Sequence, residues 1–517
     1  MTLLDNSRMR NMHTRPLPPA ACIMHAKLAI ELVYGWRLIE RQMTMRSLVM
    51  KFGGNALGTV NALSQLLGIV TRETQHWDRV VVVVSALDGV TDMLLEAAQL
   101  AQIDNLRGYR RIAANLRARH FALVDELPLA PPSRTALGAD IDQLLSQMLD
   151  ACRTIAKNLS DELLSSASDE VVAVGEQLSA RIIAALLRQH GMRGAAVDSR
   201  GLIITDAVHG NANPNFEQTA QRMQERLLPM LQRDIVPVVT GYIGATIDGE
   251  TTTLGRGGTD FTASVISALL PADALWIWAN VAGMMSADPR ELHDARVIAR
   301  LSYDEAADLA YFGAKLLHAR MIAPLAERQV PLRIKSIFAP DADGTLVAGP
   351  PKSAEPQLKA VTNVLGLSLR RRTSGSLAGV NRLVGNTLFK TLGMRSEVMI
   401  ASQSSGGSFL CLVIPTSIGI DGVDRLQRAL QAKMGEYPEK MPWHIETVSL
   451  VTAIGSRLDS APELVGQVLQ ALAGIEILAL SLGASHCSVS AVVRQADARQ
   501  AVRQIHSLVL KSGSNSG

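Results

Sequence analysis

Short apolar runs alternate with amphipathic stretches along much of the chain. The clearest run is 80–85, an almost unbroken row of valines, which is typical of a strand buried on both faces of a parallel sheet. Strands that alternate with helices predict a doubly wound α/β sheet, in which ligands bind at the carboxyl ends of the strands. The predicted strands are 47–50, 80–85, 171–174, 197–205, 235–240, 275–279 and 332–336, with a first helix over 60–73.

Two further stretches are predicted to be long and helical. Residues 93–165 have a helical pattern that is interrupted at Pro128, Pro131 and Pro132, and we expect a helical insertion that covers an edge of the sheet. Residues 303–320 also follow a helical pattern. The strand that comes next, 332–336, is predicted to be the last one of a domain that spans 47–340.

The carboxyl-terminal part of the chain has the pattern of an internal repeat. Proline, glycine, aspartate and alanine cluster near 341–358, which indicates a linker. The two units beyond it, 359–436 and 443–511, each follow the order strand, helix, strand, strand, helix, and we predict a small βαββαβ fold for both. Neither unit holds an acid/base cluster, so we expect them to serve binding or assembly. Residues 512–517 form a short tail.

The first 46 residues are set apart from these patterns. They lack the continuous apolar block of a signal peptide, and Asp5, Glu31 and Glu40 argue against a transit peptide. We expect a disordered extension, or an upstream start that was assigned in error, with Met43 or Met45 as the true beginning.

Composition excludes several classes of function. A net charge of +3, from 51 basic and 48 acidic residues, argues against nucleic acid as the main partner. No apolar run reaches the roughly 18 residues of a membrane-spanning helix, so no membrane partner is expected. The four cysteines are scattered without a C-x-x-C pair, which indicates a reducing compartment, the cytoplasm, and no structural zinc site.

The most informative chemistry lies in residues 253–263, T-L-G-R-G-G-T-D-F-T-A. Three glycines within four positions let the backbone turn tightly and approach a ligand. Arg256 adds a forked cation, and Thr259 and Asp260 stand where a helical pattern begins at Phe261. A helix N-terminus with free N–H groups binds anions. This combination suits a phosphoryl-transfer enzyme that acts on a small acid.

Six motifs in a fixed order extend this interpretation. They are K-F-G-G at 51–54, V-V-V-S-A at 82–86, G-E-x-L-S at 175–179, T-L-G-R-G-G-T-D at 253–260, A-D-P-R at 287–290 and G-A-K-L-L-H at 313–318. In this order the chain resembles the aspartate kinases, and the two carboxyl-terminal units look like their paired ACT domains. The resemblance implies an α/β amino acid kinase fold of the carbamate kinase-like, three-layer αβα type. It also implies phosphorylation of L-aspartate by ATP to 4-phospho-L-aspartate, the entry step to lysine, threonine, methionine and diaminopimelate, with a homodimer built through the ACT domains.

The resemblance also assigns roles to individual residues. Catalysis falls to Lys51 and Asp260, and a structural role is expected for His318, on one helix face with Lys315. The substrate-binding positions are Thr91, Glu176, Arg256, Gly257, Gly258 and Thr259. The nucleotide-binding positions are Lys51, Gly53, Gly54, Asn55, Ala279, Asn280, Met285, Arg290 and Lys315. An end-product effector would meet Asn381, in a turn at 379–381, and Met399 and Ser404, although these positions also suit an ordinary dimer interface. Mg²⁺ would be held mainly by nucleotide oxygens and water, without a protein metal site.

The chain departs from the family pattern on the nucleotide side. Asn55 and Ala56 replace a threonine and a serine, Ala279 and Asn280 replace a threonine and an aspartate, and Met285 replaces a frequent tyrosine. Each lost hydrogen bond costs about 0.5–1.5 kcal/mol. We therefore expect an active enzyme with a weakened nucleotide site. Two alternatives remain open: a non-catalytic subunit that binds an amino acid, and a kinase of a different acid.

Overall fold

The computed structural model describes residues 45–157, 160–314, 316–349, 355–371, 377–392, 398–404, 407–413, 419–435, 444–482 and 485–513. Contacts between residues divide the chain into two units, Met1–Arg46 and Ser47–Gly517, and the described helices and strands all belong to the second. The predicted extension 1–46 lies outside the described residues except for its last two.

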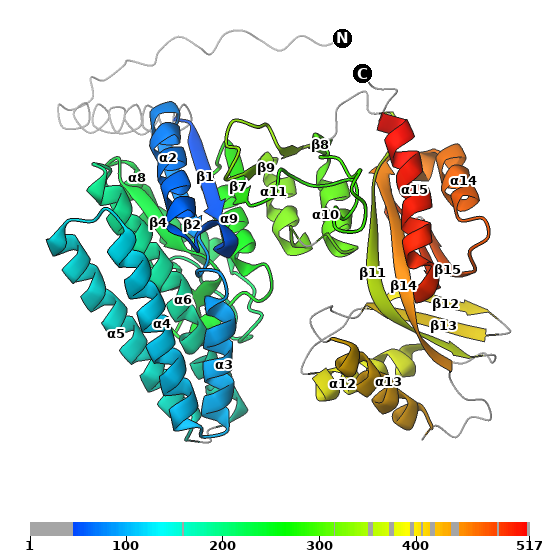
Figure 1. Cartoon of the computed structure of the whole chain (residues 1–517), viewed down its shortest axis with the longest axis horizontal. Coiled ribbons are helices and arrows are strands. Elements are labelled where there is room, and N and C mark those ends of the chain that lie inside the picture. Colours follow the sequence, from blue (N-terminus) through cyan, green and yellow to red (C-terminus); the bar gives the residue numbers. More distant parts are fainter. Residues whose placement is uncertain are drawn as a thin grey trace, which may run out of the picture. The chain divides into compact units, whose positions relative to one another are not determined.

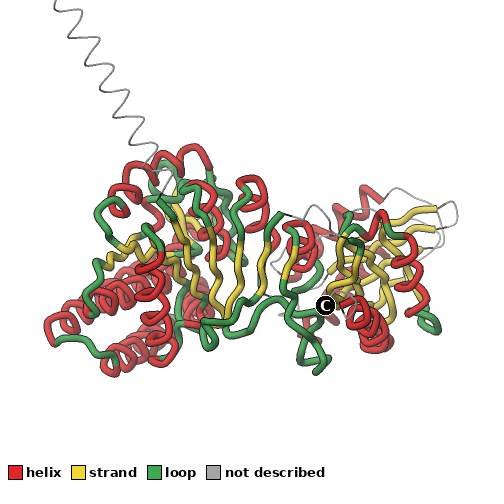
Figure 2. Tube along the Cα trace, turned by 90° about the horizontal axis from the view of Figure 1, so that it is seen from above, coloured by secondary structure: helices red, strands yellow, loops and turns green. Residues whose placement is uncertain are grey.

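A sheet of eight strands forms the centre of the amino-terminal part of this unit (Figure 1). Its order is β3-β4-β2-β1-β7-β9-β10-β8, and all neighbours pair in parallel except β9 and β10. Figure 2 shows these strands side by side, with helices on both sides. The strands are β1 (Ser47–Phe52), β2 (Arg79–Val84), β3 (Gly194–Val197), β4 (Val236–Thr240), β7 (Ala274–Ala279), β8 (Arg300–Leu301), β9 (Leu332–Ser336) and β10 (Thr345–Val347), and a separate hairpin pairs β5 (Ile243–Ala245) with β6 (Thr251–Thr253).

Both faces of the sheet are covered, which explains why its strands are apolar throughout. Every residue of β1 and β2 is buried. Alternate side chains enter two different cores, so that Leu48 and Met50 pack on one face and Val49 on the other. The continuous valine run of β2 follows from this two-sided burial.

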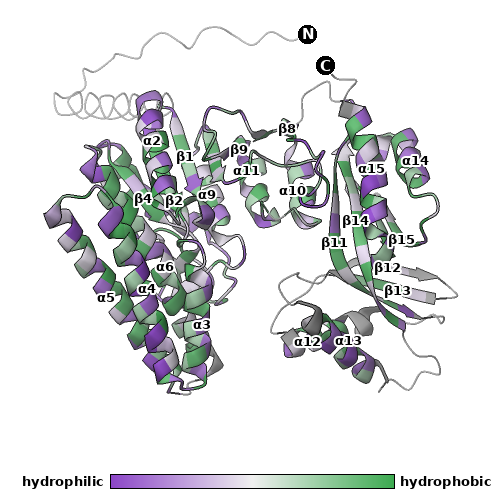
Figure 3. Ribbon diagram, viewed as in Figure 1, coloured by the Kyte–Doolittle hydropathy of each residue, from purple (hydrophilic) through white to green (hydrophobic). Residues whose placement is uncertain are grey.

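The helices form two layers around the sheet. One core joins the sheet to α2 (Val60–His76), α3 (Val90–Gln102), α4 (Leu106–Glu126), α5 (Pro131–Ile155) and α6 (Asp161–Gln189). The other joins it to η3 (Met223–Leu227), α8 (Leu228–Leu231), α9 (Gly258–Leu269), α10 (Tyr303–Tyr311) and α11 (Ile322–Arg328). The short helix α7 (Phe216–Arg222) contacts η3 and α9. Figure 3 shows polar and apolar residues alternating around α4 and α5, as expected of helices that bury one face.

Four sequence-based element predictions were wrong, each for a local reason. Residues 171–174 lie in the middle of α6 rather than in a strand, because a short apolar run has the same pattern in a buried helix. The strand predicted at 197–205 is β3, which ends at Val197. The helix predicted over 303–320 stops at Tyr311, and Gly313 then adopts a φ of 114°. β10 lies within the predicted linker and extends the sheet beyond β9.

The carboxyl-terminal units share one six-stranded antiparallel sheet, with β11 and β14 paired at its centre. The described elements in each unit follow the predicted order strand, helix, strand, strand, helix, and the final strand of a βαββαβ unit is not among the described residues. The first unit contains β11 (Gln357–Arg371), α12 (Leu377–Leu392), β12 (Val398–Ser404), β13 (Gly407–Val413) and α13 (Gly419–Gly435), and the second contains β14 (His444–Ser456), α14 (Pro462–Ala471), β15 (Ile477–Leu482), β16 (Ser488–Arg494) and α15 (Ala498–Gly513).

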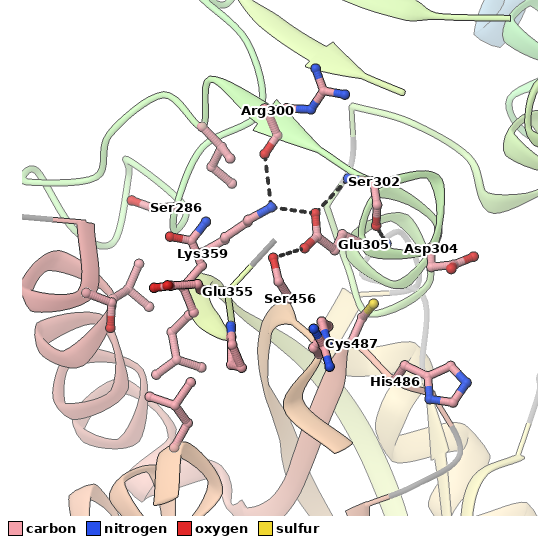
Figure 4. Close-up of a pocket in the computed structure, with 18 of the residues that line it drawn as sticks. Ser286, Arg300, Ser302, Asp304, Glu305, Glu355, Lys359, Ser456, His486 and Cys487 are labelled. Carbon is pink, nitrogen blue, oxygen red and sulfur yellow. Dashed lines mark hydrogen bonds and ion pairs between the residues drawn. The ribbon is translucent and has the colours of Figure 1, made fainter. Parts of the chain in front are cut away.

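The buried carboxylate of Glu305 links the domain of the eight-stranded sheet to that of the six-stranded sheet (Figure 4). Glu305, on α10, is 2% exposed, and its Oε2 accepts hydrogen bonds from Lys359 Nζ at 2.7 Å and from Ser302 N at 2.6 Å. Its Oε1 accepts from Ser456 Oγ at 2.6 Å. Lys359 belongs to β11 and Ser456 to β14, so α10 is tied to the two central strands of the second sheet. These residues line a cavity of about 1430 Å³.

We expect Lys359→Met to destabilise the protein, because it leaves the Glu305 carboxylate buried without its cation. The cost is about 3 kcal/mol, as for other broken buried ion pairs. Thermal unfolding with two probes, one for each sheet, measures it. The double variant Glu305→Gln with Lys359→Met should recover part of the loss, and the exposed Lys390→Met is the matched control. Equal stability of Lys359→Met and this control would contradict a structural role for the ion pair.

Candidate active site

A cavity of about 580 Å³ lies where several strands of the eight-stranded sheet end. Lys51 is near the end of β1, and Trp278 and Ala279 close β7. The turn after β2 supplies Ser85 and Ala86, and the first turns of α3 and α9 also face the cavity. The cavity thus combines the carboxyl ends of parallel strands with two helix N-termini, which is where open α/β sheets bind anionic ligands.

A short ion pair forms part of the cavity wall. Lys51 Nζ lies 2.6 Å from Asp260 Oδ1, and the two residues are only 9% and 8% exposed. Asp260 sits in the first turn of α9, where a carboxylate interacts favourably with the helix dipole. The helix begins at Gly258, three residues before the predicted start. The ion pair therefore fixes the end of β1 against the start of α9.

Two glycines allow the backbone to pack this closely. A Cβ at Gly54 would lie 2.9 Å from the carbonyl oxygen of Ala86, so the turn after β1 rests directly on the turn after β2. Gly257 has a φ of 71°, and a Cβ there would lie 2.4 Å from the Cβ of His318. His318 therefore packs against the glycine loop. His318 immediately precedes a short 3₁₀ helix, Ala319–Met321. The prediction that it lies on the face of a longer helix was wrong, because α10 ends at Tyr311.

Glu176 presents a carboxylate to this cavity from α6. The residue is 2% exposed, and its Oε1 accepts a hydrogen bond from Ala86 N at 3.0 Å. Its Oε2 is buried and accepts no hydrogen bond from any other described residue. Burial raises the pKa of Glu176 to about 8, against the lowering effect of the Ala86 hydrogen bond. A cationic ligand group would favour the charged form of this carboxylate.

Arg256 and Tyr242 complete the ligand-facing surface. Arg256 is exposed on the loop before α9, and its guanidinium makes no ion pair with the part of the chain that the structure describes. Tyr242 was not predicted. It follows β4 with a φ of 70°, an uncommon value for a residue with a side chain, and burial raises its pKa to about 12. The side chain of Thr253 partly opposes this rise in the pKa of Tyr242.

Most residues that the sequence analysis selected line this one cavity. They are Lys51, Gly53, Gly54, Asn55, Thr91, Glu176, Arg256, Gly257, Gly258, Thr259, Asp260, Ala279 and Asn280. Met285 and Arg290 do not line it. Met285 pairs with Val297 in a β-bridge, and Arg290 is exposed and forms an ion pair with Asp288. Lys315 lies outside the described residues.

Further lining residues were missed, although their position gave a signal. Ser85, Ala86 and Asp88 follow a buried parallel strand directly, which is where such sheets bind ligands. The hydroxyl of Ser85 donates to Thr259 Oγ1 at 3.0 Å and so joins the β2 turn to α9.

The predicted effector positions fall in the first carboxyl-terminal unit. Asn381 is part of α12, so the turn predicted at 379–381 was wrong. Met399 and Ser404 belong to β12. The side chains of all three residues lie outside what the structure describes.

Comparison with known proteins places the chain in a family. The model of the amino acid kinase family matches residues 46–336, more than half of the chain, and that of the ACT domain matches 451–508. The chain therefore belongs to the amino acid kinase family, and the predicted kinase fold with a carboxyl-terminal ACT domain is confirmed.

Individual relatives are aspartokinases. Bifunctional aspartokinase/homoserine dehydrogenase 2 of Arabidopsis thaliana is 29% identical over 478 residues, which cover 89% of this chain and 50% of that protein. The chain spans about half the length of this and the other bifunctional relatives. Lysine-sensitive aspartokinase 3 of Escherichia coli is 28% identical over 464 residues, 89% of this chain and 98% of that protein. The structure of E. coli aspartokinase III in complex with aspartate and ADP has 27% identity and a TM-score of 0.72, and the match covers 90% of this chain and 100% of that one.

The described residues show two further features. Their helices are all too short or too polar to cross a membrane. These residues also hold no group of three or more His, Cys, Asp or Glu side chains that could bind a metal ion. Cys152, Cys411 and Cys487 are buried free thiols.

The raised pKa of Glu176 predicts a pH dependence of stability in the free protein. Between about pH 4.5, the ordinary value, and pH 8, the folded state keeps a proton that the unfolded state has released. The free energy of unfolding should therefore fall with rising pH by up to about 1.4 kcal/mol per unit in this window, and level off above it. Glu176→Gln should lack this contribution. Urea unfolding of both proteins from pH 5 to 9 tests it, and parallel curves would show that Glu176 does not titrate there.

Proposed function

We propose that the protein is an aspartate kinase, which transfers the γ-phosphoryl group of ATP to the side-chain carboxylate of L-aspartate. One observation carries the proposal: Lys51, Asp260, Glu176 and Arg256, which come from three motifs far apart in the chain, face one cavity. The charges suit an amino dicarboxylate and a polyphosphate. The aspartokinase relatives, among them one solved in complex with aspartate and ADP, support the same substrates.

The arrangement suits positioning and charge neutralisation, the two means by which phosphoryl transfer is catalysed. A side-chain oxygen of aspartate forms a bond to the γ-phosphorus, the bond from that phosphorus to the β,γ-bridging oxygen breaks, and ADP leaves. Lys51 neutralises charge on the phosphates, and Asp260 holds the ammonium in place at 2.6 Å. The amides of Gly53, Gly54 and the start of α9 donate to phosphate oxygens.

Two groups recognise the rest of the aspartate. Arg256 binds the α-carboxylate through two parallel hydrogen bonds, and Glu176 accepts the α-ammonium with its free Oε2. Mg²⁺ accompanies ATP and would supply charge neutralisation on the phosphates. It would be held by nucleotide oxygens and water.

The carboxyl-terminal units serve regulation and assembly in this proposal. One relative is a lysine-sensitive aspartokinase, which supports an end-product amino acid as the effector. A homodimer built through these units is supported by the edge strand β15, where Ile477, Leu480 and Leu482 are exposed apolar side chains. The buried free thiols favour the cytoplasm as the location, and the reaction would open lysine, threonine, methionine and diaminopimelate synthesis.

Purified protein should release ADP when it is given Mg-ATP and L-aspartate, at a rate of roughly 1–100 per second at saturation, as is typical of kinases. A coupled assay of ADP, with hydroxamate detection of the acyl phosphate, measures it. Lysine, threonine and methionine are then added in turn. Turnover with another acid but not with aspartate would favour a different substrate. No turnover at millimolar ATP, together with thermal stabilisation by an amino acid, would favour a binding subunit.

Replacement of Arg256 by lysine keeps the charge but removes the fork that pairs with a carboxylate. We expect KM for aspartate to rise about tenfold or more, since one charge-assisted hydrogen bond contributes about 1.5–3 kcal/mol. KM for ATP should stay near the wild-type value. Arg117→Lys, at an exposed ion pair on α4, is the matched control. An unchanged KM for aspartate in Arg256→Lys would remove Arg256 from the substrate site.

A further inference from the structure

A buried carboxylate behind the active site has no role in the reaction described above. Asp169, on α6, is 5% exposed. Its Oδ1 accepts a hydrogen bond from Thr253 Oγ1 at 2.6 Å. Its Oδ2 accepts from Thr253 N at 3.1 Å and Gly210 N at 3.0 Å, and lies 3.1 Å from His209 Nδ1. Asp169 does not line the cavity.

The hydrogen-bond partners of Asp169 lie next to the glycine loop, residues 254–258. Thr253 ends β6 and leads directly into this loop. Gly210 lies in the neighbouring segment 206–214, which packs against the loop so closely that a Cβ on Gly255 would lie 2.6 Å from Asn211 Oδ1. The single side chain of Asp169 therefore connects the start of the glycine loop to segment 206–214.

Arg320 forms hydrogen bonds with the same two segments, the glycine loop and 206–214. It donates hydrogen bonds to the carbonyl oxygen of Leu254 at 2.9 Å and to that of Ala212 at 3.1 Å. It also donates to Asn211 Oδ1 at 2.7 Å and to Asn213 Oδ1 at 2.9 Å. The loop is thus restrained at its first residue, while Arg256 remains exposed in the cavity.

Asp169 and Glu176 share one face of α6. They are seven residues apart, which is close to two helical turns and about 10 Å along the helix axis. Glu176 presents its free carboxylate oxygen to the cavity, whereas Asp169 anchors the loop that carries Arg256. The helix therefore sets the distance between the acceptor for a substrate ammonium and the guanidinium for its carboxylate.

We propose that Asp169 is a positioning residue for the amino acid substrate: it holds the glycine loop in register with Glu176, so that Arg256 and Glu176 engage the two charged ends of one molecule. The proposal rests on the proposed function. Burial raises the pKa of Asp169, against hydrogen bonds from Thr253, Gly210 and His209. A carboxylate buried at this place costs more free energy of folding than an apolar side chain would. Ionisable groups in such unfavourable surroundings are common at functional sites.

Two substitutions at this position separate the hydrogen bonds from the charge. Asp169→Leu leaves the amides of Thr253 and Gly210 without an acceptor. Asp169→Asn can keep all four contacts, with its oxygen toward the two amides and His209 and its NH₂ group donating to Thr253 Oγ1. We expect Asp169→Leu to raise KM for aspartate by roughly 10- to 100-fold, as for a small misplacement of a binding group. KM for ATP should change little, and Asp169→Asn should restore most of the affinity.

Thr253→Val provides a milder variant in case Asp169→Leu folds poorly. It removes the 2.6 Å contact of the Thr253 hydroxyl to Asp169. It should raise KM for aspartate less than Asp169→Leu does, with Thr253→Ser close to wild type. Glu73→Gln, another buried acid that lies on α2 away from the loop, is the control for general destabilisation. Equal rises in both KM values, or a fall in kcat alone, would contradict a positioning role.

Hydrogen exchange of the ligand-free protein tests the restraint without any assay of activity. In Asp169→Leu, amides of residues 206–214 and 251–258 should exchange faster than in wild type, while those of α2 and α4 stay protected. Uniformly faster exchange, or none, would overturn the proposal. If the wild-type protein shows no aspartate turnover while this local change is present, the proposed function fails and the anchoring by Asp169 stands.

Discussion

The ion pair between Lys51 and Asp260 is the contact on which the rest of the site depends. It joins the end of a central strand to the first turn of α9, and its 2.6 Å separation is set within a nearly buried environment. The pairing offsets the free-energy cost of burying either ion, which is several kcal/mol for an unpaired one. The two glycine-rich segments on either side, 53–54 and 255–258, are therefore brought to one place by the requirement that these charges meet.

The other charges of the cavity are arranged in the opposite way. Glu176 Oε2 accepts no hydrogen bond from another described residue, and Arg256 forms no ion pair with the described part of the chain. The paired Lys51 and Asp260 thus fix the framework on the side of the cavity proposed for the phosphates, and the two unpaired groups are left for the proposed amino acid. Such preorganisation lets a ligand gain full electrostatic interaction without first breaking contacts inside the protein. The long helix α6 carries Glu176 on a rigid element, and the anchored loop does the same for Arg256.

The sequence predicts the parts of this structure that depend on local pattern. Apolar runs located β1, β2, β4, β7 and β9, and the rule that ligands bind at strand ends selected most of the cavity's lining. Sequence-based prediction failed where the same apolar pattern fits both a strand and a buried helix, as in residues 171–174 of α6. Asp169 was missed because it acts through Thr253, which is 84 residues away in the chain. Such contacts exist only after folding and leave no spacing signal.

The departures from the family pattern take a definite physical meaning in this geometry. Asn55 and Asn280 line the cavity, so amides stand where the family has a hydroxyl and a carboxylate. Loss of the carboxylate removes a charged acceptor for nucleotide hydroxyl groups, and each such bond contributes about 1.5–3 kcal/mol. It also removes a negative charge that would repel the phosphates. The two effects oppose each other, whereas the Lys51–Asp260 pair, Glu176 and Arg256 are unaltered. If the protein acts as proposed, these changes affect selectivity among nucleotides before the chemistry of transfer, because the groups proposed to bind the amino acid are the same as in the family pattern.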